Sequence, residues 1–127
     1  MTTPSEIGIV GLGTMGKNLA LNIEEKGRSV ALWDRDSDKT RAFAEAGGRF
    51  RVAETLDELA GALQMPRRIL LMVPAGKPVD ETLAALAPHL EAGDTVIDGG
   101  NEHYAETEAR QAHWRKRGVH LIGMGVS

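Results

Sequence analysis

The fold of this chain is decided by one stretch near its amino terminus, Ile7-Gly8-Ile9-Val10-Gly11-Leu12-Gly13-Thr14-Met15-Gly16. The first four residues form an apolar run of strand length, and the last six match the pattern G-x-G-x-x-G. The pattern alone is common by chance, but here it follows directly on the predicted strand and opens a segment with helical spacing, residues 15–26. This context predicts a strand–turn–helix unit whose turn binds the pyrophosphate of a dinucleotide.

Each glycine of the turn has its own task in this prediction. Gly11 permits the tight turn, Gly13 lets a pyrophosphate approach the backbone, and Gly16 lets helix and strand pack closely. The N–H groups at the start of the helix then face the phosphates, whose negative charge the helix dipole favours. A glycine turn that binds nothing is the alternative, but it requires neither this spacing nor the acidic residue that follows the second predicted strand, Asp34.

The rest of the chain repeats the alternation of strand and helix. Further strands are predicted at residues 30–33, 50–52, 69–73, 95–97 and 119–122, and further helices at residues 37–46, 55–63, 79–90 and 104–117. Several strands lack polar alternation, as a parallel sheet buried on both faces requires. Glycines at helix ends support these limits: Gly27, Gly47, Gly48, Gly93 and Gly118. We therefore predict one domain over residues 1–127 with a Rossmann-type, doubly wound α/β fold, a mainly parallel sheet between two helical layers.

Composition excludes several classes of function. The 127 residues are 42% hydrophobic, enough for one core, and the absence of cysteine excludes disulfides and thiolate chemistry. The net charge is −3 and the cationic residues are dispersed apart from a cluster at residues 115–117, so no nucleic-acid partner is expected. The four histidines lack metal-ligand spacing. Neither a signal peptide nor a membrane segment is predicted, which favours the cytoplasm.

Coenzyme preference depends on the residues after the second predicted strand. Asp34 lies 18 residues after Gly16 and can accept hydrogen bonds from an adenosine ribose, which favours NAD because a carboxylate repels a 2′-phosphate. Arg35 would attract that phosphate. Asp36 adds a negative charge unless it only caps the following helix. The charges favour NAD and leave NADP open. Trp33, beside them, is predicted to be a core residue rather than an adenine contact.

Two further stretches carry a resemblance to a known family, Ile97-Asp98-Gly99-Gly100-Asn101 and Gly123-Met124-Gly125-Val126-Ser127. Together with residues 11–16 and 66–69, they resemble the 6-phosphogluconate dehydrogenases over essentially the whole chain. Related β-hydroxyacid dehydrogenases usually carry a serine or threonine pair where this chain has Gly99 and Gly100. Because residues 123–127 follow directly on a predicted strand, we expect the chain to be a fragment.

The resemblance implies oxidation of 6-phosphogluconate at its third carbon, then decarboxylation to ribulose 5-phosphate, a step of the pentose phosphate pathway that needs no metal. Carried over by position, the coenzyme contacts are Gly11, Leu12, Gly13, Thr14, Met15, Gly16, Asp34, Arg35, Val73, Pro74, Ala75 and Asn101, and the substrate contacts are Asn101 and Ser127. The family's catalytic lysine and glutamate lie in a downstream helical domain. No catalytic residue is therefore expected here, the chain alone should be inactive, and the full-length protein should be a homo-oligomer.

The chain also departs from the family pattern. The usual Asn-Arg-Thr of NADP-dependent members reads Asp34-Arg35-Asp36, a common lysine is replaced by Pro74, and the serine after the asparagine is Glu102. The first two departures add negative charge or remove positive charge near the coenzyme, which weakens the NADP assignment. Two alternatives stay open: a free-standing NAD(P)-binding module, and another β-hydroxyacid dehydrogenase or imine reductase of the superfamily.

Overall fold

The computed structural model describes residues 3–46, 50–74, 76–99 and 104–123. The order of elements is β1 (Ile7–Val10), α1 (Thr14–Glu25), β2 (Val30–Trp33), α2 (Ser37–Ala46), β3 (Phe50–Val52), α3 (Leu56–Gly61), β4 (Arg68–Leu71), α4 (Lys77–Leu86), the 3₁₀ helix η1 (Ala87–His89), β5 (Thr95–Asp98), α5 (Tyr104–Arg115) and β6 (His120–Gly123). Strands and helices therefore alternate along the chain as predicted.

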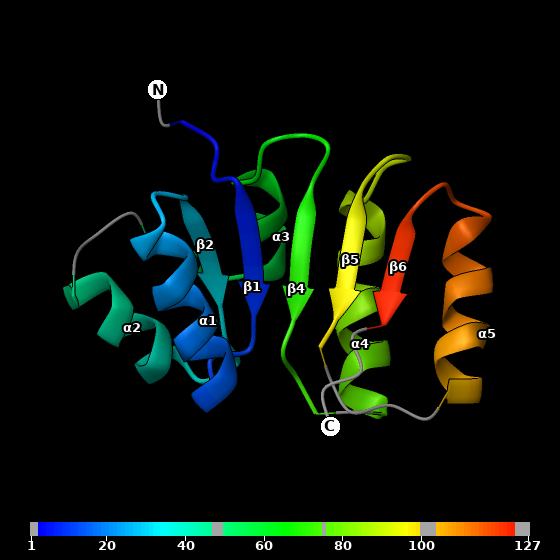
Figure 1. The fold of residues 1–127 in the computed structure, drawn as a ribbon, viewed down its shortest axis with the longest axis horizontal. Helices are drawn as coiled ribbons and strands as arrows, with labels where there is room; N and C mark the ends of the chain where they lie inside the picture. The colour runs from blue at the N-terminus through cyan, green and yellow to red at the C-terminus, as the bar shows by residue number, and fades with distance from the viewer. Residues whose placement is uncertain (1–2, 47–49, 75, 100–103, 124–127) are drawn as a thin grey trace.

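The six strands form one sheet in the order β3-β2-β1-β4-β5-β6, and every neighbouring pair is parallel (Figure 1). The chain builds outward from β1 to β3, then crosses back to β4 and builds outward in the other direction. The direction reverses between β1 and β4, where a doubly wound sheet opens a crevice at the carboxyl ends of its strands. The predicted doubly wound fold is confirmed, with a fully parallel sheet.

Helices cover both faces of the sheet, because successive strand residues point to opposite sides. On one face, Leu59 of α3, Leu83 of α4 and Trp114 of α5 pack against one set of strand residues. On the other face, Ala20 of α1 and Phe43 of α2 pack against the alternate set. Figure 1 shows α1 and α2 in front of the sheet, with α3 and α4 behind it. The three-layer arrangement follows, and Trp114 is a core residue.

Four predicted elements end at least two residues earlier in the structure, two of them near prolines. The third helix ends at Gly61 rather than at residue 63. The fourth helix ends at Leu86 rather than at residue 90, because the chain tightens into η1 where Pro88 lacks the N–H that an α-helix needs. Strand β4 ends at Leu71 rather than at residue 73, just before Pro74, which cannot donate to a ladder. The fifth helix ends at Arg115 rather than at residue 117.

Positive φ angles confirm two of the five glycines predicted at helix ends. Gly27 and Gly118 have φ angles of 89° and 78° and follow α1 and α5, as expected. Gly93 has a φ of 99° but lies in the turn before β5, so it does not cap α4. Gly47 and Gly48 lie outside the described residues.

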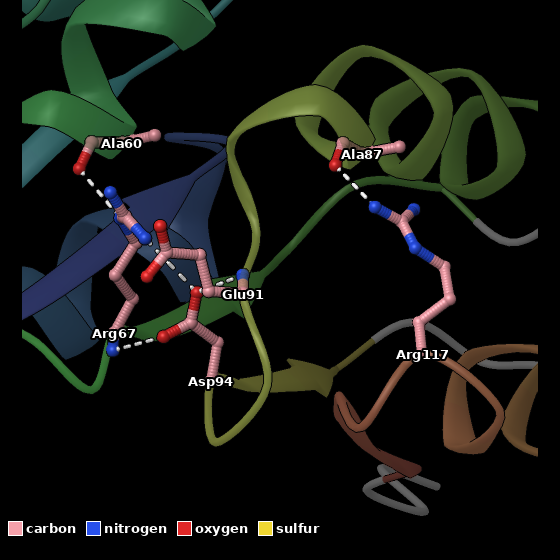
Figure 2. A network of polar contacts seen from close by, with 6 residues as sticks. All are labelled: Ala60, Arg67, Ala87, Glu91, Asp94 and Arg117. Carbon is pink, nitrogen blue, oxygen red and sulfur yellow. Dashed lines mark hydrogen bonds and ion pairs between the residues drawn. The ribbon is translucent and has the colours of Figure 1, made fainter.

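A buried carboxylate joins the loops that precede β4 and β5 (Figure 2). Asp94 is 0% exposed. It accepts hydrogen bonds from the backbone N–H groups of Arg67 and Glu91 at 2.7 and 2.8 Å. The guanidinium of Arg67 lies 3.2 Å from the same carboxylate and donates to the carbonyl of Ala60 at 3.0 Å. This network ties the amino-terminal ends of two central strands to α3.

Arg117, in the cationic cluster at residues 115–117, has a structural role after the end of α5. It donates to the carbonyl of Ala87 at 2.7 Å (Figure 2). Its guanidinium also lies over the Trp114 ring, 4.7 Å from the centroid. Arg117 therefore holds η1 against the end of α5, and no anionic partner is needed to explain it.

Arg110 of α5 and Asp80 of α4 provide a pH-dependent link between the two helices. Two guanidinium nitrogens of Arg110 donate to the Asp80 carboxylate at 2.6 and 3.0 Å. The hydrogen bonds from Arg110 lower the pKa of Asp80 below its ordinary value, although burial opposes them. A carboxyl group with a depressed pKa stabilises the fold above its unfolded pKa of about 3.9, and this contribution is lost as pH falls through the folded pKa.

We expect Asp80→Asn to lower the free energy of unfolding at pH 7 by less than about 1 kcal/mol, since the Asp80 side chain is 60% exposed and screened by solvent. At acidic pH, below the folded pKa of Asp80, the difference should disappear, because the wild-type carboxyl is then also neutral. Urea unfolding of both proteins across this range measures it. A difference that stays constant with pH would contradict the assignment.

Candidate coenzyme site

A cavity of about 720 Å³ opens at the carboxyl ends of the central strands, beside the point where the strand order reverses. It is bounded by the loops after β1, β2 and β4 and by the first turns of α3 and α4. Eight of the predicted coenzyme contacts line it: Gly11, Gly13, Met15, Gly16, Asp34, Arg35, Val73 and Pro74. In open α/β sheets this crevice is where ligands bind.

The other predicted contacts do not line this cavity in the described part of the chain. Leu12 is buried, at 4% exposure, and its side chain belongs to the core. Thr14 lines a shallower depression beside Lys17 and α2. Ala75, Asn101 and Ser127 lie outside the described residues.

The glycine turn is built as the sequence predicts. Gly11 has a φ of 99°, and a Cβ there would collide with the carbonyl oxygen of Met72. A Cβ on Gly16 would collide with the carbonyl oxygen of Gly11, so helix α1 packs directly on the turn that ends β1. At Gly13 the position of a Cβ has no described atom within 4 Å. The backbone is therefore open to a ligand at Gly13 and closely packed at the other two glycines.

Helix α1 presents its amino terminus to the open side of this turn. Gly13 is the N-cap residue and provides no side-chain hydrogen bond to the first N–H groups of the helix. Such N–H groups, together with the helix dipole, attract phosphate oxygens. The residues present thus fit the pyrophosphate of a dinucleotide.

Asp34 has a structural task that the sequence did not reveal. One carboxylate oxygen accepts a hydrogen bond from the backbone N–H of Leu12 at 2.5 Å, and the other accepts from the N–H of Asp36 at 2.7 Å. Each carboxylate oxygen has a second acceptor site. Asp34 can therefore fix the glycine turn and accept a ribose hydroxyl at the same time.

Asp36 caps helix α2, which was one of its two predicted roles. Its carboxylate accepts a hydrogen bond from the backbone N–H of Asp38 at 3.0 Å, the geometry of a helix cap. Its carboxylate also adds a negative charge two residues after Asp34, which was the other predicted role.

Charged residues from three elements meet at the cavity. Arg35 lies 3.5 Å from the carboxylate of Glu81 on α4, and the other carboxylate oxygen of Glu81 lies 3.9 Å from the ammonium of Lys77. Lys39 of α2 also lines the cavity. Sequence reasoning missed Lys39 and Glu81, because their positions in helices resemble those of ordinary solvent-exposed residues.

The remaining lining of the cavity is largely apolar. Trp33 lines the cavity and also packs against the core, so the predicted core role is right but incomplete. Its indole N–H donates to the carbonyl of Glu54 at 3.2 Å. Gly99, which the sequence marked only as part of the family resemblance, also lines the cavity. The lining is completed by residues that sequence reasoning did not single out: Leu56, Met72, Pro78 and Thr82. Their helical or strand periodicity is explained by packing, so no local signal marked them as site residues.

Within the described ranges no group of three histidine or acidic side chains is placed to hold a metal ion. His89 lies 2.6 Å from the carboxylate of Asp57. None of the helices in the described part of the chain is long and apolar enough to cross a membrane.

Comparison with known proteins agrees with this geometry. The family model for the NAD binding domain of 6-phosphogluconate dehydrogenase matches residues 6–127. The NADP(+)-dependent, decarboxylating 6-phosphogluconate dehydrogenase of Bacillus subtilis is 48% identical over 124 residues, which are 96% of this chain and 26% of that protein. The decarboxylating 6-phosphogluconate dehydrogenase of Chlamydia trachomatis is 42% identical over 130 residues, or 100% of this chain and 27% of that protein.

A solved structure extends the agreement to three dimensions. The Plasmodium falciparum 6-phosphogluconate dehydrogenase, described in its apo form and in complex with NADP+ and with 6-phosphogluconate, superposes with a TM-score of 0.88 at 36% identity. The match covers 96% of this chain and 27% of that one. The chain thus spans about a quarter of the length of these relatives. With the open glycine turn and the family match in agreement, this chain belongs to the family of NAD-binding domains of 6-phosphogluconate dehydrogenase.

Proposed function

We propose that this chain is the coenzyme-binding part of a decarboxylating 6-phosphogluconate dehydrogenase, which acts as a homo-oligomer when complete. The observation that carries the proposal is the open backbone at Gly13, at the start of α1 and inside the cavity. When bound, the nicotinamide coenzyme accepts the hydride from the third carbon of 6-phosphogluconate. The family's lysine and glutamate belong to the helical domain, so this chain should bind coenzyme without turning over substrate.

Each part of the site has a role in this proposal. The backbone at Gly13 and the amino terminus of α1 would hold the pyrophosphate, and Asp34 would accept the adenosine ribose hydroxyls. Trp33 and Leu56 would then border the adenine, since they line the cavity near Asp34. Val73 and Pro74, after β4, would line the nicotinamide half. Further contacts are proposed for residues outside the described part: Ala75 and Asn101 with the coenzyme, and Asn101 and Ser127 with the substrate.

We also propose that the coenzyme is NAD in preference to NADP. Two carboxylates line the cavity, those of Asp34 and Glu81, and Asp36 adds a negative charge two residues after Asp34. The guanidinium of Arg35 is already 3.5 Å from the Glu81 carboxylate. A 2′-phosphate would face this excess of negative charge, whereas a ribose hydroxyl can donate to it. The printed names of two relatives point to NADP instead. The preference of this chain therefore rests on its own residues after β2.

Calorimetric titration of the chain with NAD and with NADP, at matched low ionic strength, tests both proposals. We expect NAD to bind at least about tenfold more tightly, which corresponds to about 1.4 kcal/mol. Tighter binding of NADP would show that Arg35 and Lys39 outweigh the carboxylates. Failure to bind either coenzyme would contradict the proposed function itself. With 6-phosphogluconate added, the chain alone should produce no reduced coenzyme by absorbance.

A further inference from the structure

We propose that Glu81 is a specificity-determining residue that disfavours NADP by occupying the guanidinium of Arg35. The inference rests on the proposed function, because it concerns which coenzyme the same cavity prefers. It concerns a residue on α4, far in sequence from the loop after β2 that the coenzyme signature marks.

The ion pair joins two sides of the cavity. Arg35 follows β2 and Glu81 lies one turn into α4, 46 residues later, and both line the cavity. One oxygen of Glu81 is 3.5 Å from a terminal nitrogen of Arg35, and the other is 3.9 Å from the ammonium of Lys77. Each oxygen of the Glu81 carboxylate therefore faces a cation.

Among the described residues, two cations line the cavity, Arg35 and Lys39. An arginine beside the acidic residue at the end of the second strand is the usual ligand of a 2′-phosphate in dinucleotide-binding folds. In this chain Arg35 is 83% exposed and its described ionic partner is Glu81. The group that would recognise NADP is therefore already in contact with a carboxylate.

The ion pair between Arg35 and Glu81 should disfavour the binding of NADP but not the binding of NAD. The 2′-phosphate carries close to two negative charges, so it must either displace Glu81 from Arg35 or lie beside an unscreened carboxylate. Either outcome lowers the affinity for NADP. The 2′-hydroxyl of NAD is neutral and incurs neither penalty. Glu81 should therefore affect one coenzyme and leave the other unchanged, unlike Asp34, which can touch the ribose of both.

The substitution Glu81→Gln tests this inference, because it removes the charge and keeps the shape of the side chain. In the same low-salt titrations, we expect the Kd for NADP to fall by about threefold to tenfold and the Kd for NAD to stay within about twofold. The gain should shrink when ionic strength is raised, since both groups are exposed. Thermal unfolding should be unchanged.

A matched control is Glu108→Gln, which makes the same change of net charge on α5. This helix packs beside β6, an edge strand separated from β2 by β1, β4 and β5. It should leave the affinity for both coenzymes unchanged. If Glu108→Gln also strengthened NADP binding, the effect would be caused by the change of net charge alone, and the proposal would be overturned.

A double-mutant cycle tests whether Glu81 affects the affinity for NADP through Arg35. In an Arg35→Ala background, Glu81→Gln should no longer change the affinity for NADP. A gain that persists without Arg35 would overturn the proposal, as would a loss of NADP affinity in the single variant or an equal change for both coenzymes. If the wild-type chain binds neither coenzyme, the proposed function fails instead, and the two failures are thereby distinguished.

Discussion

Replacing Gly13 by valine is expected to weaken coenzyme binding by about 100-fold or more, roughly 2.8 kcal/mol, while the domain remains folded. A Cβ at this position would meet no described atom within 4 Å beyond its chain neighbours, so the space beside the Gly13 backbone is open. That space is where a pyrophosphate must approach the backbone. Titration with NAD measures the loss, and urea unfolding should show a cost of at most about 1 kcal/mol, from the poorer helix cap.

The neighbouring glycine supplies the contrast for this experiment. A Cβ on Gly16 would collide with the carbonyl oxygen of Gly11, so Gly16→Ala should itself destabilise the fold by about 1–3 kcal/mol. If Gly13→Val loses coenzyme binding but keeps its stability, while Gly16→Ala loses stability, then Gly13 contacts the ligand and Gly16 serves packing. Normal coenzyme binding by Gly13→Val would place the pyrophosphate elsewhere and remove the main support for the proposed function.

Replacing Asp94 by alanine is expected to lower the free energy of unfolding by about 3–5 kcal/mol. The change leaves the guanidinium of Arg67, 13% exposed, without its carboxylate, and it removes the acceptor for two backbone N–H groups. For a domain of this size the melting temperature should fall by about 10 °C or more. Thermal and urea unfolding measure both quantities.

A second variant separates the buried charge from the packing around it. In Arg67→Met with Asp94→Leu no charge is left unpaired, so the double variant should be more stable than Asp94→Ala. This network lies at the amino-terminal ends of β4 and β5, away from the cavity at their carboxyl ends (Figure 2). Coenzyme affinity of the folded double variant should therefore match the wild type. A stability loss below about 1 kcal/mol for Asp94→Ala would show that the network contributes little.

Much of the fold could be predicted because its signals are local. The apolar run of β1, the three glycines and Asp34 lie within residues 7–34, so the spacing of one segment marks them together. Strand and helix periodicity likewise depends on near neighbours. Element ends were less certain, since Leu86 and Leu71 end their elements where a nearby proline outweighs the periodic pattern.

The site was only partly predictable, because its remaining residues come together from separate elements. Trp33 was predicted as core from its apolar area, yet the cavity beside it exists only after α3 and α4 pack against the sheet. The same holds for Leu56, whose spacing is that of a core-facing helix residue. No local pattern distinguishes such a residue from one that also faces a ligand.

The sequence by itself determined the doubly wound fold, the glycine turn and the acidic residue after the second strand, since each is marked by a pattern of residues within a short segment. The tertiary structure alone decided that Glu81 meets Arg35 and that Asp94 meets Arg67, pairs separated by 46 and 27 residues. Charged side chains in helices and loops look alike in a sequence. Their partners are fixed by the order of strands in the sheet, which brings α4 to the loop after β2 and β5 to the loop before β4.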